Sequence, residues 1–395
     1  MIREVKNIKG GDKSRKISKL TKYKFRNKKL SRALNKMKKF KVGILGATGM
    51  VGQKFISLLE NHPWFEINIL AASSKSAEKT FREAIKNKTN IENKISEKIL
   101  NLKVLDVCKD AKKIADSVDF VFCALNTNKD DIKLLEETYA KLECPVISNN
   151  SANRMVSDIP MIIPEINAHH MEIIPYQKNR LKTKRGFIAV KSNCSIQCYV
   201  PALHPLFSNS ISDILVCTYQ AISGAGKSFE NWPEMVDNII PFISGEEEKS
   251  EQEPLKIWGQ IENGKIINNK DICITSQCFR VPVSDGHTAA VFAKFKNKIS
   301  PEEAIQKIEN FKCSQQSLGL PSSPKKFLHY FDENDRPQIK LDRNIENGMG
   351  ISIGRLREDS QYDIKFVCMS HNTIRGAAGG AILLAEMLCR EGYIQ

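Results

Sequence analysis

The apolar positions of residues 40–150 recur in short buried runs, with stretches of helical periodicity between them. Val42, Ile44 and Leu45 predict a strand, and the apolar positions from Phe55 to Leu59 predict the inner face of a helix. The runs INILAAS (67–73), DFVFCAL (119–125) and PVISN (145–149) predict further strands, with a helix near 129–142 and a lysine-rich surface stretch over 75–118. Strands that alternate with helices indicate a doubly wound, parallel α/β sheet.

After about residue 186 the strand-like runs become denser and the helices fewer. These runs are ILVCTYQAI (214–222), CFRVPV (278–283), TAAVFAKFK (288–296), GISIGRL (350–356) and DIKFVCM (363–369). They predict a mixed or antiparallel second domain. A final helix is expected over 375–391, after the glycine-rich turn IRGAAGG.

The net charge of +15 is concentrated in one segment. Residues 1–39 hold sixteen Lys/Arg and two Asp/Glu, so the rest of the 395-residue chain is close to neutral. We expect this segment to be disordered or weakly helical, and Met37 is a plausible natural start. A basic tail differs from a basic patch on a domain, so nucleic-acid binding is not expected. No apolar run approaches the roughly 18 residues of a membrane span, and no secretory h-region is present.

Eleven cysteines without a signal peptide suit reduced thiols in the cytoplasm or an organelle matrix. The closest pairs, Cys194/Cys198 and Cys273/Cys278, belong to no CxxC array, so no metal site is predicted.

A glycine-rich turn, GATGMVG, joins the first strand to the first helix. Gly46, Gly49 and Gly52 allow a pyrophosphate to approach the backbone at the helix N-terminus. The second strand ends in Ser73, Ser74 and Lys75, where NAD-binding folds usually place a carboxylate. Hydroxyls and an ammonium suit a 2′-phosphate, so we predict NADP in preference to NAD.

Cys194 stands out among the cysteines by its position. It follows the predicted strand IAVKSN and precedes an apolar helical stretch, so it lies at a helix N-terminus, where the dipole favours a thiolate. Cys198, Cys217 and Cys368 are predicted to be buried spacers. A thiolate nucleophile needs an acid/base partner.

Two histidines are candidates for that partner. His287 lies in RVPVSDGHTAA with Arg280, and His371 precedes Asn372 and the GAAGG turn. The remaining histidines are predicted in surface segments (His62, His169, His170 and His329) or in an apolar helix (His204). An arginine and a histidine across a turn could serve a carboxylate substrate and a general acid/base.

Six motifs in this order resemble aspartate-β-semialdehyde dehydrogenase, in particular its archaeal/fungal-type branch: GATGMVG, SNCS, TYQAISGAG, GEEEK, RVPVSDGHT and HNTIRGAAG. The resemblance covers roughly residues 39–395. It implies that Cys194 attacks the acyl phosphate of L-4-aspartyl phosphate and that phosphate leaves. NADPH then reduces the thioester to aspartate semialdehyde, on the route to lysine, threonine and methionine. It also implies a homodimer or homotetramer in the cytoplasm.

We expect three domains, of which the basic extension (1–39) follows from composition. The other two agree with the resemblance and are an NADP-binding Rossmann domain (40–190, completed by 370–395) and a catalytic and dimerisation domain (191–369). The resemblance further implies a set of site residues. The implied catalytic residues are Cys194, His287 (general acid/base) and Gln220 (orientation). The implied substrate residues are Arg280 for the α-carboxylate, Glu246 for the α-amino group, and Lys249, Arg154 and Asn193 for the phosphate. The implied cofactor residues are Gly46, Ala47, Thr48, Gly49, Met50, Val51, Ser73, Ser74, Lys75, Ser223, Gly224 and Asn372.

The sequence leaves several alternatives open. The amino-group contact could fall on Glu247 or Glu248 instead of Glu246, and ALNTNKD departs from the family after Ala-Leu, so no contact is carried over to Asn126 or Thr127. Malonyl-CoA reductase and N-acetylglutamyl-phosphate reductase share the scaffold. An NADP-sensing nucleic-acid-binding protein is the alternative of another class. It would require a basic face on the folded part.

Overall fold

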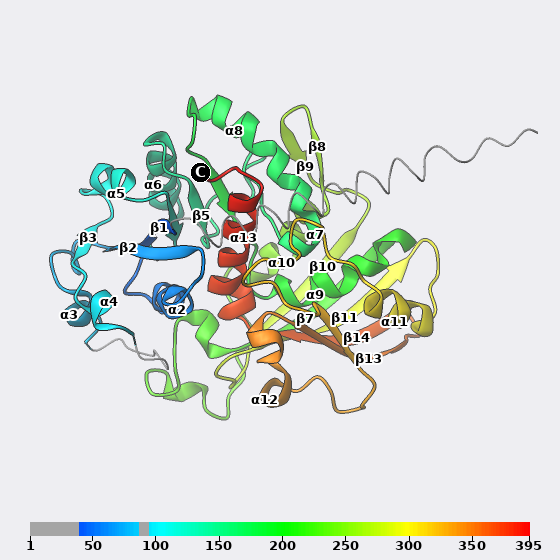
Figure 1. Cartoon of the computed structure of the whole chain (residues 1–395). Helices are drawn as coiled ribbons and strands as arrows, with labels where there is room; N and C mark the ends of the chain where they lie inside the picture. The colour runs from blue at the N-terminus through cyan, green and yellow to red at the C-terminus, as the bar shows by residue number, and fades with distance from the viewer. Residues whose placement is uncertain (1–38, 87–94) are drawn as a thin grey trace, which may run out of the picture. The chain divides into compact units, whose positions relative to one another are not determined.

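Figure 1 shows the computed structural model, which describes residues 39–86 and 95–395. The predictions for the basic extension, including a start at Met37, lie outside the described residues apart from Lys39.

A six-stranded parallel sheet forms the N-terminal part. Its strands are β1 (Phe40–Leu45), β2 (Phe65–Ala72), β3 (Val104–Asp106), β4 (Phe120–Cys123), β5 (Val146–Ser148) and β6 (Ile188–Val190). The spatial order is β3-β2-β1-β4-β5-β6, the order of a dinucleotide-binding sheet. Val42, Ile44 and Leu45 are fully buried, as the apolar pattern predicts. The predicted Rossmann-type fold is confirmed.

Helices connect these strands. They are α2 (Met50–Leu59), α3 (Phe81–Ile85), α4 (Glu97–Leu100), α5 (Ala111–Ser117), α6 (Lys129–Lys141), α7 (Pro164–Asn167) and α8 (Ile174–Leu181). Of the predicted inner face of α2, Phe55, Ile56 and Leu59 are buried, whereas Leu58 is half-buried. The prediction of a surface stretch over 75–118 is wrong in part, because β3 within it is buried at every position.

The second sheet is mixed, as predicted. Its strands are β7 (Ile211–Gln220), β10 (Cys273–Arg280), β11 (His287–Phe295), β12 (Leu328–Phe331), β13 (Ile351–Glu358) and β14 (Ile364–Ser370), in the order β10-β7-β11-β14-β13-β12. β7 pairs in parallel with β10 and antiparallel with β11. The ends of β7 and β10 and the start of β11 therefore lie at one edge, and they carry Gln220, Arg280 and His287.

Further helices and a hairpin complete this half. They are α9 (Ile196–Leu203), α10 (Glu246–Ile257), α11 (Pro301–Glu309), α12 (Ile339–Asp342) and the hairpin β8–β9 (Gln260–Glu262 and Lys265–Ile267). α9 is buried along its whole length and contacts β11, β13 and β14. α10 packs on β10.

The chain ends in helix α13 (Gly379–Arg390), drawn in red in Figure 1. A π-helical turn, Ile374–Ala378, precedes it, and the predicted final helix is confirmed with this difference at its start. α13 is buried at every position and contacts α2 and β5, so the C-terminal segment packs against the nucleotide-binding sheet.

Candidate active site

Cys194 lies in the tight turn between β6 and α9. It stands directly before Ser195, the N-cap residue of α9. The Asn193 side chain fixes this turn, because its Oδ1 accepts hydrogen bonds from the Ser195 backbone N–H (2.8 Å) and hydroxyl (2.7 Å). Gly376 of the π-helical turn packs against the cysteine, and a Cβ built there would lie 2.9 Å from Cys194 Cβ. The backbone of Cys194 is therefore held on two sides.

His287 is the histidine that contacts Cys194. Its Nε2 lies 3.3 Å from Sγ, and its Nδ1 accepts the backbone N–H of Ala221 at 3.0 Å. Because Nδ1 accepts, a neutral ring carries its proton on Nε2, directed at Sγ. Burial, together with the nearby Arg280, lowers the pKa of His287 to about 3, so the ring is neutral near pH 7. The competing candidate, His371, instead contacts the Thr373 hydroxyl.

A buried carboxylate, Glu246, gathers the predicted substrate residues around itself. It accepts hydrogen bonds from Asn193 Nδ2 (3.0 Å), Gln220 Nε2 (3.1 Å) and Lys249 Nζ (2.7 Å). Burial acts to raise the pKa of Glu246, but Lys249 and the amide donors hold it below its usual value. Glu246 is therefore an anion.

The neighbouring glutamates point elsewhere. Glu247 accepts from Gln277 and from the backbone of Cys278, and Glu248 is exposed. Of the three candidates, Glu246 alone has its carboxylate among the predicted substrate residues in the described part of the chain.

Arg280 ends β10 beside the same site. It is buried, and its Nη1 donates to the carbonyl of Ala221 at 2.7 Å. Gly224 leaves just enough room for this side chain, since a Cβ at that position would lie 2.8 Å from Arg280 Nη1 and 3.1 Å from His287 Cε1. One turn, residues 221–224, thus contacts both Arg280 and His287.

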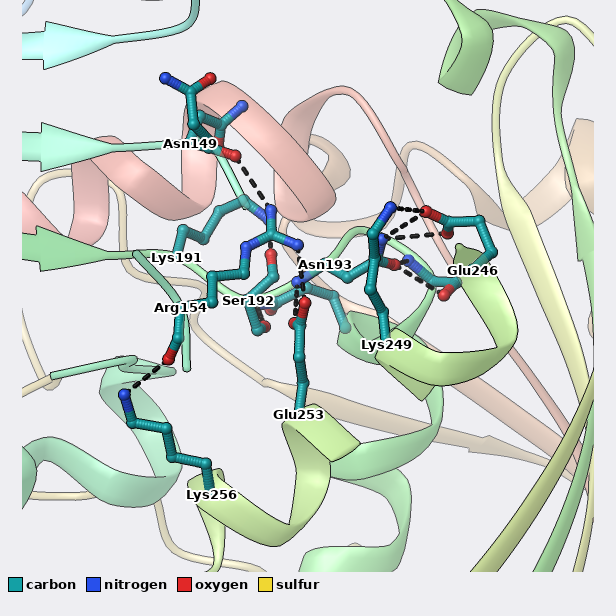
Figure 2. Close-up of polar contacts among 12 residues, drawn as sticks. Asn149, Arg154, Lys191, Ser192, Asn193, Glu246, Lys249, Glu253 and Lys256 are labelled. Atoms are coloured by element: carbon teal, nitrogen blue, oxygen red, sulfur yellow. Dashed lines mark hydrogen bonds and ion pairs between the residues drawn. The ribbon is translucent and has the colours of Figure 1, made fainter. Parts of the chain in front are cut away.

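A second polar cluster adjoins Asn193 (Figure 2). Arg154 donates to Glu253 at 2.8 Å and to the carbonyl of Asn149 at 2.9 Å. The other oxygen of Glu253 accepts the Asn193 backbone N–H at 2.6 Å. Figure 2 shows that Glu253 reaches this cluster from the same helix, α10, that carries Glu246 and Lys249. Arg154 therefore reaches the site already paired with a carboxylate.

Sequence reasoning missed several residues of this region. Lys256 donates to the carbonyls of Arg154 (2.5 Å), Val156 (2.7 Å) and Ile159 (2.7 Å), which holds the Arg154 loop. Lys191 and Glu253 were also missed. Glu253 and Lys256 lie seven and ten residues after Glu246 on one helix face, but exposed helices show the same spacing, so the sequence did not mark them as buried.

Two predictions of exposed histidines are wrong. His62 is buried with its Nε2 at 2.7 Å from Glu386, and His170 is buried with its Nε2 3.0 Å from the carbonyl of Gly259. Both partners are far away in sequence, so the local pattern gave no sign of them. Cys198 and Cys368 are buried as predicted, whereas Cys217 is half-exposed.

The residues predicted to hold the cofactor lie at the carboxyl ends of β1 and β2. Gly46 has φ +88°, and a Cβ there would lie 2.3 Å from the carbonyl oxygen of Ala124. No side chain caps the N-terminus of α2, so the backbone N–H groups of its first turn can face a ligand. The residues that form or flank this turn are Ala47, Thr48, Gly49, Met50 and Val51. Ser73, Ser74 and Lys75 are exposed directly after β2. This arrangement fits a nicotinamide dinucleotide with a 2′-phosphate.

At the opposite end of the predicted cofactor site, Asn372 bridges two loops. It accepts the Gly286 backbone N–H at 2.8 Å and donates to the Ser223 hydroxyl at 2.9 Å. The bridge fixes the turn that holds Gly224 next to His287. The roles of all these residues toward ligands stay predictions.

Two family models match the chain in succession. The model described as semialdehyde dehydrogenase, NAD binding domain, matches residues 41–174, and the model described as semialdehyde dehydrogenase, dimerisation domain, matches residues 203–375. The aspartate-semialdehyde dehydrogenase of Archaeoglobus fulgidus is 41% identical over 361 residues, covering 90% of this chain and 100% of the relative. The chain belongs to the aspartate-semialdehyde dehydrogenase family.

Fungal relatives agree with this assignment. The Aspergillus fumigatus enzyme is 40% identical over 366 residues, covering 90% of this chain and 99% of that one. The crystal structure of the Candida albicans enzyme with NADP aligns with a TM-score of 0.81 at 37% identity, over 90% of this chain and 100% of that chain. The predictions of an oxidoreductase, of the archaeal/fungal-type resemblance and of a nicotinamide cofactor are confirmed.

Membrane-spanning helices and metal-binding clusters are absent from the described residues. Across 39–86 and 95–395, no helix has both the length and the apolar character to cross a membrane. Within the same ranges, no group of three or more His, Cys, Asp or Glu side chains is arranged to hold a metal ion.

Proposed function

We propose that the protein reduces L-4-aspartyl phosphate to L-aspartate 4-semialdehyde with NADPH and releases phosphate, on the route to lysine, threonine and methionine. One observation carries the proposal. Cys194 Sγ lies 3.3 Å from His287 Nε2, at an edge where Arg280 and Glu246 also converge. A thiol, a neutral imidazole, a guanidinium and a carboxylate match the parts of an amino-acid acyl phosphate.

We infer the following roles for the substrate residues. Arg280 binds the α-carboxylate and Glu246 the α-amino group, because each is buried and carries the complementary charge. Gln220 and Asn193 orient Glu246 through their amide donors. Lys249 and Arg154 face the leaving phosphate. Malonyl-CoA has no α-amino group, so a buried anionic Glu246 favours the aspartyl substrate over that alternative.

In the first step Sγ bonds to the acyl carbon and the bond from that carbon to the phosphate oxygen breaks. His287 donates from Nε2 to sulfur and so stabilises the thiolate before attack. Bound NADPH supplies the hydride that converts the thioester to the aldehyde, and the thiolate leaves. Thr48–Val51 would hold its pyrophosphate and Ser73–Lys75 its 2′-phosphate, which favours NADP over NAD. Ser223, Gly224 and Asn372 would line the nicotinamide end.

We further propose a homodimer in which a second copy covers the outer face of the mixed sheet. The match to a dimerisation domain over 203–375 supports this. On that face Tyr219, which is exposed, stacks on Phe279 with ring centroids 5.8 Å apart. A tetramer would need a second interface.

The domain division at about residues 190 and 370 stays part of the proposal, since each side has its own sheet. We also propose a cytoplasmic location, which the free state of all eleven cysteines supports.

The test is phosphate-dependent reduction of NADP with aspartate semialdehyde, run beside malonate semialdehyde with coenzyme A. We expect turnover with the first pair and its near-complete loss in Cys194→Ser, with nucleotide binding retained. Turnover with the second pair alone would make the chain a malonyl-CoA reductase, and an active serine variant would remove Cys194 from the chemistry.

A further inference from the structure

Cys194 itself is half-exposed, but the side chains around it, among them Asn193, Arg280 and His287, are buried. A thiolate there therefore needs a positive charge nearby. His287 does not supply one, since its pKa of about 3 leaves it neutral. The charged groups that act on Cys194 come from four elements: Glu246 on α10, Lys191 after β6, Arg154 from the loop after β5, and Arg280 at the end of β10. The counter-charge is therefore a lysine or an arginine.

Four other cations near the site already have an anionic partner or a predicted one, and the buried Lys256 donates instead to three backbone carbonyls of the Arg154 loop. Arg154 pairs with Glu253 at 2.8 Å and Lys249 with Glu246 at 2.7 Å. Arg280 is assigned to the substrate carboxylate. Arg375, which also acts on Lys191, binds both oxygens of Glu165 at 2.6 and 2.7 Å.

Lys191 is different. It is 2% exposed, and its Nζ donates to the carbonyl of Ser192. Among the ion pairs of the described residues, none includes Lys191. In Figure 2 its side chain runs from the end of β6 toward the Arg154 cluster. A fully buried lysine without a carboxylate at ion-pair distance is expensive to keep charged, so an anion close to it would be strongly favoured.

The C-terminal helical segment places Lys191 and Cys194 close together. A Cβ at Gly376 would lie 2.9 Å from Cys194 Cβ, and a Cβ at Gly380 would lie 3.3 Å from Lys191 Cδ. These glycines are four residues apart on the segment that leads into α13, and Ala377 between them has non-helical dihedral angles (φ −141°, ψ −107°). The cysteine and the lysine stem therefore pack against the same short segment.

We propose that the Lys191 ammonium is the counter-ion of the Cys194 thiolate. Lys191 is then a positioning residue that acts through Cys194. The proposal rests on the proposed function in that Cys194 is the nucleophile.

The titration behaviour of the two groups supports this pairing. Burial, and then Arg154, lowers the pKa of Lys191 to about 7, whereas Cys194 and Glu253 act to raise it. Burial and then Glu246 raise the pKa of Cys194, and Lys191 is the largest influence in the opposite direction. Each group thus favours the charged form of the other, and the two should titrate as a coupled pair.

The test is the pH dependence of Cys194 alkylation by iodoacetamide in the full chain without substrate, followed by peptide mass mapping. Cys194 is partly exposed, and the exposed Cys108 and Cys273 serve as internal references. In Lys191→Met the inflection of the Cys194 alkylation rate against pH should rise by about one pH unit. Alkylation of Cys194 at pH 7 should therefore slow about tenfold. The reference cysteines should not change.

Two further variants protect the test against misfolding. Lys191→Gln should behave as the methionine variant does, and Lys191→Arg, which keeps the charge, should keep the inflection. Lys178→Met is the matched control. Lys178 lies on α8, with its ammonium over the Phe187 ring, and this variant should behave as the unaltered chain does.

Each outcome of these measurements either supports or overturns the proposal. An unchanged inflection in folded Lys191→Met or Lys191→Gln, or a raised one in Lys191→Arg, overturns the proposal. A variant that loses phosphate affinity but keeps the inflection would make Lys191 a phosphate ligand instead. Because alkylation needs no substrate, a wrong substrate assignment leaves this result standing, so the two failures can be told apart.

Discussion

Gly376→Ala should damage catalysis far more than stability. The added methyl would lie 2.9 Å from Cys194 Cβ, 3.2 Å from its Cα and 3.3 Å from its carbonyl oxygen. Since carbon atoms pack at about 3.5–4.0 Å, the cysteine and Gly376 must separate by at least about 0.5 Å. The position of this backbone sets the distance of 3.3 Å between Cys194 Sγ and His287 Nε2, so the shift moves the proposed nucleophile relative to His287 and Arg280.

The magnitude follows from the shift. A misplacement of about 1 Å at a reacting atom costs on the order of 100-fold in rate, so half of that should lower kcat by about 10- to 100-fold. Overpacking by one methyl should lower the free energy of unfolding by about 1–3 kcal/mol, which leaves the protein folded. The assay is phosphate-dependent NADP reduction at saturating substrates, with thermal unfolding measured in parallel.

Gly319→Ala is the matched control. Gly319 has φ +70° and no atom within 4 Å of a built Cβ, so alanine there costs about 1–2 kcal/mol of backbone strain without touching Cys194. Its kcat should be unchanged. If Gly376→Ala kept kcat within about threefold of the unaltered chain, the packing of the π-helical turn would not position the nucleophile.

Three other outcomes are expected. Arg280→Lys should lose about 2–4 kcal/mol of transition-state binding with its melting temperature kept, because an ammonium makes no two-point contact with a carboxylate; a near-normal kcat/KM would remove Arg280 from the site. Replacing Ser74 by Asp and Lys75 by Ala should abolish a preference for NADP, and equal kcat/KM values for both cofactors in the unaltered chain would contradict the 2′-phosphate site. Burial lowers the pKa of His170, His204 and His371 to about 4, against 6.5 for a free side chain. The unfolded chain therefore binds more protons below pH 6.5, and the free energy of unfolding should fall by about 1.4 kcal/mol per histidine and pH unit from 6.5 toward 4. Melting curves from pH 7.5 to 5 check this, and His170→Gln should flatten the slope.

The local sequence pattern was enough to predict the main strands and the glycine-rich turn of the fold. Buried strands such as β1 and β4 are continuous apolar runs, and the glycines of GATGMVG mark the turn, so these elements need no distant information. β3 was missed because three residues are too few to show a period. His62 and His170 were misplaced because their burial depends on Glu386 and on the carbonyl of Gly259, which the fold brings from 324 and 89 residues away.

The site residues likewise fall into those that the sequence predicted and those that depend on the fold. The position of Cys194 before a helix predicted its place, and the resemblance predicted His287, Gln220 and Arg280, which the fold brings to one edge. The contact from the Ala221 backbone N–H, which sets the tautomer of His287, has no side-chain signature and could not be found in the sequence. Lys191 looked like the polar end of a strand, since no local pattern reveals that an ammonium is enclosed on every side.

Helix α10 is rich in charged residues, yet part of it is buried. EEEKSEQEPLK has the composition of a solvated helix face, and Glu248 is indeed exposed. Glu246, Lys249, Glu253 and Lys256, however, follow one another at intervals of three, four and three residues, which aligns them on a single stripe. That stripe meets Gln220 and Asn193 at its first turn and the Arg154 loop at its last. Exposed helices also place acid and base three and four residues apart, where they form ion pairs, so this spacing alone does not mark an inward face. What distinguishes α10 is that Glu246, Glu253 and Lys256 are buried, and that their partners come from the turn after β6, from β7 and from the Arg154 loop. Those partners are distant in sequence, so the inward face of α10 follows from the fold and could not be found from the charge pattern.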